Sequence, residues 1–215
     1  MQNRTRTILA LILNGILFLI GPIGLIYSGP THKAGLFQFY TQDSNIFAFL
    51  LSGVTAAFLL RKLLRNKELP GWVRFLKYTS VCCISVTFCI VMFLFIPVLA
   101  VRGEDFTFLL VGGSAFWYHI LCPVLTMAGY ILLEGFPTMP FRWTIFSLVP
   151  TAIYAFITIL LNALYVLHGP YPFLYVHEQT IFMSVFWVAS IHAAAYVLSV
   201  IFWASSLKIS KAFLK

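Results

Sequence analysis

The sequence predicts an all-α, polytopic membrane protein in which six transmembrane helices form one bundle and both termini are cytoplasmic. The first observation is composition: 61% of the 215 residues are hydrophobic and 9% are charged, whereas about a quarter of the residues in soluble domains are charged. The second is length, because a helix needs about 20 mostly apolar residues to cross a hydrocarbon core of roughly 30 Å. Six stretches of this kind fill most of the chain as a single membrane domain: residues 7–27, 36–60, 78–101, 106–133, 144–167 and 179–206.

The third observation is the distribution of basic residues, which fixes the predicted orientation. With the N-terminus in the cytoplasm, only Lys33 and Arg102 of the 14 lysines and arginines fall outside, as expected for the positive-inside pattern. The net charge of +8 is therefore a topology signal and does not indicate a nucleic-acid partner. Most of the charge is assigned to the segment between the second and third stretches: Arg61, Lys62, Arg65, Lys67, Arg74 and Lys77.

The first stretch, 7–27, has a basic start and an apolar core, like a secretory signal. Its apolar run is too long, and no small-x-small cleavage site follows before Pro30, so we expect an uncleaved span. Asn14, with Gly21 one heptad later, marks its inward face. The third and fourth stretches hold all the cysteines, so neither a disulfide nor a metal site is predicted from them: Cys82, Cys83, Cys89 and Cys122.

The other stretches carry stripes of polar residues at helical spacing. Lipid does not stabilise these side chains, so each stripe is expected to face the interior of the bundle. The stripes are Thr41, Ser44, Asn45, Ser52 and Thr55 in the second stretch, His119, Cys122 and Thr126 in the fourth, Thr151, Thr158 and Asn162 in the fifth, and His192, Ala195 and Ser199 in the sixth. Such stripes can line either a reaction chamber or a hydrogen-bonded core.

Prolines lie within or at the ends of three stretches, at Pro97, Pro123 and Pro150. Each removes a backbone donor and frees the carbonyl four residues earlier, which favours a kink. For Pro123 that carbonyl belongs to His119. Membrane helices also accommodate proline without any functional role, and both interpretations stay open.

The strongest candidate for chemistry is the polar cluster that opens the second stretch, residues 40–45. Thr41 could act as a nucleophile if His119 served as its base, with Asn45 one turn later as an orienting group or oxyanion donor. Ser44 lies on the same stripe, whereas Asp43 points to a different face. Thr41 could instead be a helix N-cap, and His119 an imidazole satisfied by a neighbouring helix. By residue count His119 lies about 20 Å, and Thr41 about 8 Å, below the start of its stretch. The sequence therefore does not decide whether the two side chains come into contact.

Two other histidine arrangements compete with this pairing. His119 and His192 could together hold a haem, although no further haem signature accompanies them. His168 and His177, with Glu178, could bind a metal in the loop before the sixth stretch, but loop histidines are commonly solvated. No cofactor is predicted.

At the same residues the chain resembles a known family. Phe39-Tyr40-Thr41-Gln42-Asp43-Ser44-Asn45 resembles the F-T-x-x-S-N signature of the bacterial Pr6Pr-type membrane proteins, and His119 followed by Pro123 resembles their H-x-x-x-P. Arg142-Trp143 and the segment 169–174 also match that pattern. This family is distantly similar to the androgen-induced membrane hydrolases, six-span proteins that cleave fatty-acid esters of hydroxy fatty acids with an intramembrane threonine and histidine. The resemblance implies Thr41 and His119 for these two roles.

The sequence therefore leads to two hypotheses. The first is an intramembrane hydrolase of lipid esters in a bacterial plasma membrane, with Thr41 and His119 as catalytic residues. Five residues are expected to bind or orient the lipid-like substrate: Asn45, Ser44, Asp43, Asn162 and His192. The second is a non-enzymatic membrane protein whose polar core binds or transports a small lipid or solute.

Overall fold

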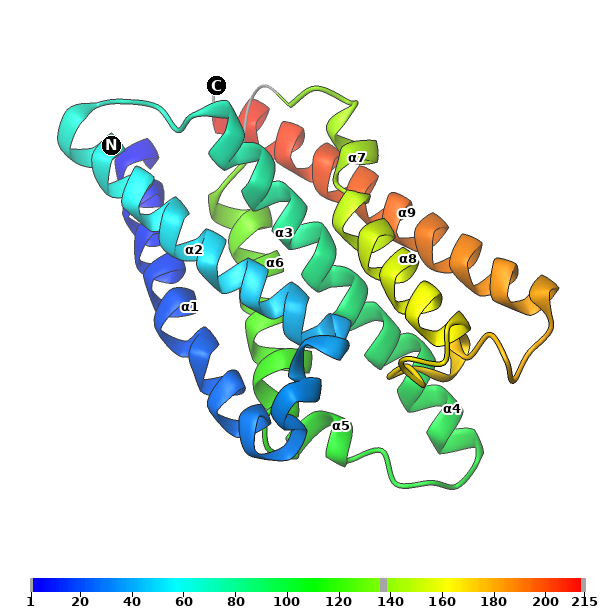
Figure 1. Cartoon of the computed structure of the whole chain (residues 1–215). Coiled ribbons are helices and arrows are strands. Elements are labelled where there is room, and N and C mark those ends of the chain that lie inside the picture. The colour runs from blue at the N-terminus through cyan, green and yellow to red at the C-terminus, as the bar shows by residue number, and fades with distance from the viewer. Residues whose placement is uncertain (1, 136–138, 214–215) are drawn as a thin grey trace.

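A computed structural model describes residues 2–135 and 139–213 of the chain. Those residues fold into one all-helical bundle, and six of the helices are long and apolar enough to cross a membrane. The protein is therefore an integral membrane protein, as the sequence predicts. The first and last described helices bring both ends of the chain to the same end of the bundle (Figure 1). The spans are Arg4–Gly29, Tyr40–Arg65, Gly71–Val101, Phe116–Leu133, Trp143–Ala163 and Ile181–Lys208.

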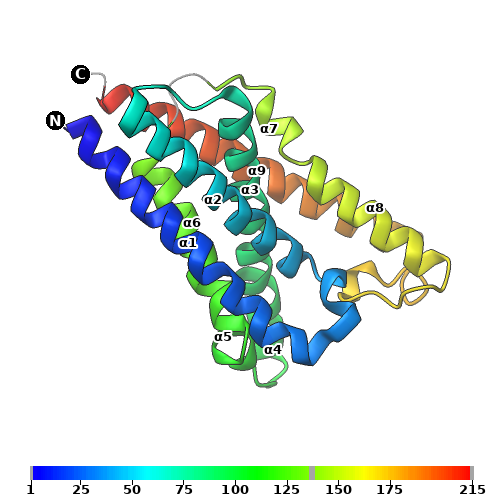
Figure 2. The same ribbon diagram turned by 60° about the vertical axis from the view of Figure 1, so that its left-hand side comes forward.

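The bundle is arranged around α3, which contacts α2, α6 and α9. In Figures 1 and 2, α1, α2 and α6 lie on one side of α3, and α8 and α9 lie on the other. The long helices are α1 (Gln2–His32), α2 (Tyr40–Arg65), α3 (Gly71–Ile90), α6 (Cys122–Leu133), α8 (Val149–Ala163) and α9 (Ile181–Phe213). Shorter ones are η1 (Lys33–Gln38), α4 (Ile96–Val101), α5 (Phe108–Val111), α7 (Trp143–Phe146) and η4 (Pro172–Leu174).

Two of the prolines follow wide, π-helical turns. The segment η2 (Val91–Phe95) precedes Pro97, and η3 (Phe116–Leu121) precedes Pro123. At the end of each, the backbone bond spans five residues, from Ile96 N to Val91 O and from Cys122 N to Trp117 O. Because proline cannot donate a backbone bond and its ring crowds the previous turn, a π-bulge is a common local solution. The fourth span is thus distorted at His119. Pro150 lies in the first turn of α8, where α7 has just ended.

The fourth span begins later than the sequence suggests. After α5 the chain turns at Gly112-Gly113, and the span starts at Phe116 instead of residue 106. Gly113 has a φ of +48°, a left-handed conformation that glycine adopts without steric cost. His119 therefore lies near the start of its span, which removes most of the depth mismatch with Thr41.

Lys77 is also placed differently from the sequence prediction. The sequence assigns it to the basic loop, but it lies inside α3 and its side chain is fully buried. The cause is that α3 begins at Gly71, one turn and a half before Lys77, so the last basic residues of the loop are already helical. Composition could not reveal this, because a lysine near the end of a span is usually solvated.

Candidate functional site

A small cavity lies where α2, α3, α8, α9 and the loop between α8 and α9 meet. Thr41, Tyr171, Thr87, Thr151 and His192 supply its polar groups, and aliphatic and aromatic side chains form the rest of its wall. We call it the Thr41 cavity. Its volume is about 40 Å³, which is room for roughly three water molecules at 10–15 Å³ each. It can hold water for a reaction, but an acyl chain could enter it only if its walls moved.

Thr41 is presented to this cavity from the first turn of α2. The N-cap position is held by Phe39, in an extended conformation and with no side-chain cap bond, so Thr41 is not the N-cap. Its backbone N–H, one of the donors that a helix start leaves without a partner, donates to the Tyr171 phenol oxygen at 3.4 Å. The Thr41 hydroxyl lies 3.4 Å from the same oxygen. Tyr171 is therefore the group nearest to a Thr41 nucleophile.

Tyr171 belongs to the loop between the last two spans, which folds into the bundle and covers the cavity. Its ring stacks on Phe173 with centroids 5.2 Å apart, and Phe173 and Leu174 are buried. Burial raises the pKa of the Tyr171 phenol; its hydrogen bonds with Thr41 partly oppose that shift. The phenol is thus protonated at neutral pH and can donate a hydrogen bond. Sequence reasoning did not single out this residue, although it lies between Pro170 and Pro172 in the segment 169–174 that carries part of the family resemblance.

Ser44 and Asn45 join the start of α2 to its neighbours. The Asn45 amide donates to the carbonyl of Thr41 at 2.8 Å and to that of Tyr118 at 3.1 Å. The Ser44 hydroxyl pairs with that of Thr87 on α3 at 2.8 Å. Asn45 therefore connects the second and fourth spans through backbone carbonyls, and in this arrangement its amide N–H groups are directed at those carbonyls and not at the Thr41 hydroxyl.

His119 and His192 differ in their relation to the cavity. His192 lines it, whereas His119 is not among its lining residues. The Nδ1 atom of His192 bonds to the Val188 carbonyl at 2.8 Å, and that of His119 to the Leu109 carbonyl at 2.7 Å. Since a carbonyl only accepts, Nδ1 carries the hydrogen in both rings, and Nε2 of each neutral imidazole is left with a lone pair.

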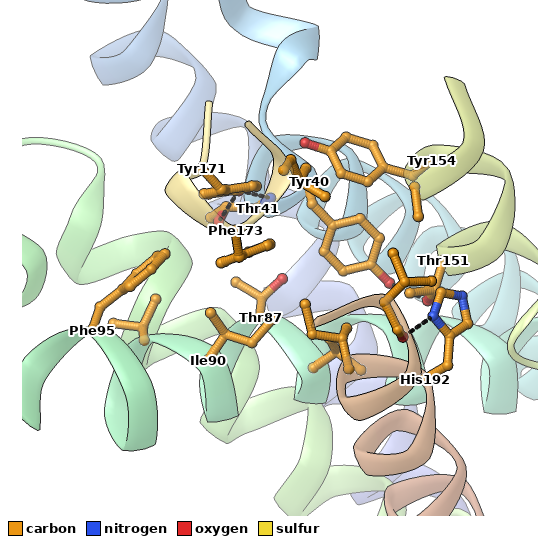
Figure 3. Close-up of a pocket in the computed structure, with 16 residues that line it drawn as sticks. Tyr40, Thr41, Thr87, Ile90, Phe95, Thr151, Tyr154, Tyr171, Phe173 and His192 are labelled. Atoms are coloured by element: carbon orange, nitrogen blue, oxygen red, sulfur yellow. Dashed lines mark hydrogen bonds between the residues drawn. The ribbon is translucent and has the colours of Figure 1, made fainter. Parts of the chain in front are cut away.

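Figure 3 shows how these groups lie in the cavity. Thr41 and Tyr171 are close together, and His192 lies on the far side with Thr151, with the Tyr40 ring between the two pairs. The Tyr40 hydroxyl bonds to that of Thr151 at 2.6 Å. The structure thus brings Thr41 and His192 to one cavity, and a base at His192 would act through water or after Tyr40 moves.

Asn162 has a different role from a cavity residue. Its amide donates to the carbonyls of Leu167 and His168, and its oxygen accepts from the backbone N–H of Val176 at 2.9 Å. It therefore shapes the loop that carries Tyr171. In the same loop His168 pairs with Glu178 at 2.7 Å while both stay exposed. Within residues 2–135 and 139–213, no group of three or more His, Cys, Asp or Glu side chains could hold a metal.

A second polar cluster, which the sequence did not reveal, lies inside the other half of the bundle. The Lys77 ammonium donates to Asn14 at 2.8 Å and to Ser52 at 3.1 Å, and lies 3.7 Å from the Glu134 carboxylate. The Asn14 amide also donates to Glu134. Lys77 and Glu134 expose 0% and 3% of their side chains, and charges buried to this degree are normally paired. This cluster has no described connection to the Thr41 cavity.

Comparisons with models of protein families, with curated proteins and with solved structures found no match for this chain. The class that fold and site define is therefore an integral membrane protein of six candidate spans with a small, partly polar cavity between them.

Proposed function

We propose that this protein is an intramembrane hydrolase of lipid esters, such as fatty-acid esters of hydroxy fatty acids, with Thr41 as its nucleophile. The observation that carries the proposal is the Thr41 hydroxyl on a mainly apolar cavity, beside the Tyr171 phenol and on the same cavity as His192. Cavities with apolar walls and a few convergent polar groups are typical of small-molecule sites. The resemblance of residues 39–45 to membrane hydrolases adds to this support. The distribution of basic residues favours cytoplasmic termini, and the resemblance to a bacterial family favours a bacterial plasma membrane.

The proposed reaction has two steps. The Thr41 hydroxyl attacks the ester carbonyl and gives its proton to a histidine Nε2, which passes the proton to the departing alcohol. Water then attacks the acyl-threonine, its proton passes through the same histidine to Thr41, and the fatty acid leaves. The Tyr171 phenol, held protonated by burial, donates to the oxyanion in both steps.

We assign the base role to His192, because it lines the Thr41 cavity and its Nε2 has a lone pair. His119, which the family resemblance implies, is the competing choice. Its Nε2 has a lone pair as well, but its side chain does not line the Thr41 cavity, although Asn45 holds the neighbouring Tyr118 backbone against the start of α2.

A second function is favoured by one specific observation. The described partner of the Thr41 hydroxyl is a phenol at 3.4 Å and not an imidazole. A protein that binds or transports a lipid or small solute needs only such hydrogen-bonding groups and apolar walls. It would be stabilised by its ligand without forming a product.

The test is hydrolysis of a lipid ester by the purified protein and its alanine variants. We expect Thr41→Ala to lower turnover at least about a hundredfold, since the reaction has no other nucleophile, and His192→Ala to lower it by a similar factor. A fluorophosphonate should label the wild-type protein at Thr41. If His119→Ala abolishes turnover and His192→Ala does not, the base assignment changes.

The matched control is His168→Ala, because His168 is an exposed loop histidine. It should retain full turnover, and thermal unfolding in detergent should show that every variant folds. Full activity in folded Thr41→Ala would contradict the hydrolase, and ligand-dependent stabilisation without product in the wild type would favour the second function.

A further inference from the structure

A larger groove adjoins the Thr41 cavity between α2 and α8. Its volume is about 500 Å³, more than ten times that of the cavity. Tyr40 and Tyr154 line both spaces, and their rings pack with centroids 5.0 Å apart, so these two rings separate groove from cavity. The side chains of Phe37, Ile153 and Ile157 line the groove and are about half exposed or more. The groove is therefore open at the surface of the bundle, where lipid would surround it.

The groove contains one carboxylate, that of Asp43. Asp43 is half-buried, and within the described part of the chain its carboxylate has neither a hydrogen bond nor an ion pair. An unpaired charge that is partly removed from water is unfavourable, and a cation beside it restores the lost stabilisation. The sequence places Asp43 on a different face from Thr41, and in the structure Asp43 lines the groove whereas Thr41 lines the cavity.

Aromatic rings surround the same space as this carboxylate. Phe37, Tyr40, Phe47 and Tyr154 all line the groove. A lipid or ligand ammonium group is attracted to the faces of such rings, and rings arranged around a cation are the usual site for quaternary ammonium groups. A carboxylate with several aromatic side chains in one groove is thus complementary to an ammonium group attached to an apolar chain. A neutral head group could give Asp43 only a hydrogen bond, without charge compensation, and an anionic head group would be repelled by it.

We propose that this groove binds a lipid ester whose head group carries an ammonium ion, with the cation beside Asp43 and its apolar chain along Ile153 and Ile157. This names an ammonium ester as the substrate class in place of the fatty-acid esters of hydroxy fatty acids, whose free carboxylate Asp43 would repel. It rests on the proposed function only in taking the bound lipid to be the ester that Thr41 cleaves. Binding itself does not require catalysis. The ester would reach Thr41 when Tyr40 and Tyr154 separate.

The test compares two esters that differ in one atom: decanoylcholine, and the decanoyl ester of 3,3-dimethylbutanol, in which carbon replaces the nitrogen. Dissociation constants are measured by tryptophan fluorescence on the full-length Thr41→Ala protein in a neutral detergent, so that neither ester is consumed. We expect decanoylcholine to bind at least about tenfold more tightly, since one desolvated cation contact is worth a factor of that order. Equal constants for the two esters would overturn the inference.

Variants locate the charge that makes the difference. Adding Asp43→Asn should remove most of the preference for decanoylcholine, whereas Glu178→Gln, which removes an exposed acid from the nearby loop, should leave it unchanged. A preference that persists in Asp43→Asn would also overturn the inference. If that variant does not fold, Asp43→Glu should retain the preference. The comparison of the two esters on the unaltered groove then decides whether the groove selects the ammonium group.

The inference and the proposed function fail in different ways. A preference for decanoylcholine in a wild-type protein that hydrolyses neither ester supports the groove and rejects the hydrolase. Hydrolysis of both esters at equal rates and with equal affinity supports the hydrolase and rejects the ammonium site.

Discussion

At the scale of single residues, Lys77 shows how a charge is tolerated inside this bundle. Its ammonium is fully buried but has three polar partners, Asn14, Ser52 and Glu134, from three other segments of the chain. A charged side chain within a span is costly unless it is paired and faces the bundle interior. Removing one member leaves polar groups of the others without a partner in a low-dielectric interior, which costs stability.

We therefore predict that Lys77→Met destabilises the protein by about 3–5 kcal/mol, because it removes the buried ammonium 3.7 Å from the Glu134 carboxylate. The double variant Lys77→Met/Glu134→Gln should recover most of that loss. The measurement is thermal or denaturant-induced unfolding in detergent.

The control is the exposed pair Lys62–Glu68, whose nitrogen and oxygen are 2.7 Å apart but whose side chains are 30% and 78% exposed. Lys62→Met should cost no more than about 1 kcal/mol. Equal losses of unfolding free energy for Lys77→Met and Lys62→Met would show that the buried pair contributes no more to stability than the exposed one.

At the scale of elements, α1 packs closely against α2 and against η3 of the fourth span, because its glycines leave space for their side chains. A Cβ added to Gly21 would overlap the Phe49 side chain, and one added to Gly24 would overlap the Tyr118 ring. The Tyr118 hydroxyl also donates to the Gly21 carbonyl at 2.9 Å. Small residues at such positions let membrane helices approach each other, and the resulting van der Waals contacts drive their association.

Gly21→Ala should consequently destabilise the bundle by about 1–3 kcal/mol, since the new methyl group meets the near end of the Phe49 side chain and not a flexible tip. Gly15→Ala is the matched change on the same helix: nothing lies within 4 Å of its added Cβ. Alanine is the better helix former, so Gly15→Ala should be neutral or slightly stabilising. The melting temperatures of the two variants in detergent compare them directly, and an unchanged Gly21→Ala would contradict close packing at that site.

At the scale of the whole molecule, the two ends of the bundle differ in charge. The chain ends and the loop between α2 and α3 lie at one end, and the loop between α4 and α5 lies at the other (Figure 1). The first of these ends is rich in lysine and arginine, and the second loop contains Glu104 and Asp105. The positive-inside pattern predicts that the end with the termini faces the cytoplasm.

This orientation can be tested with single cysteines in intact cells. Asp105→Cys should react with a membrane-impermeant maleimide added outside, whereas Lys67→Cys should react only after permeabilisation, since both positions are exposed at opposite ends. The native protein is the control, because three of its cysteines are buried and Cys89 is partly buried. The reverse pattern would invert the orientation, and labelling of both from outside would contradict a membrane crossing by Gly71–Val101, the one candidate span between the two positions.

The sequence by itself determined that this protein is a bundle of six apolar helices, because hydropathy and charge are local properties that add along a helix. It also marked Thr41, Ser44 and Asn45 as inward-facing, since helical spacing alone puts them on one stripe. Only the tertiary structure decided which of these groups meet. Thr41 finds its partner in Tyr171, 130 positions along the chain, and it shares a cavity with His192 but not with His119. Such pairings depend on helix rotation, on the π-turn before Pro123 and on the fold of one loop, and these arise from packing between distant segments that no local pattern records.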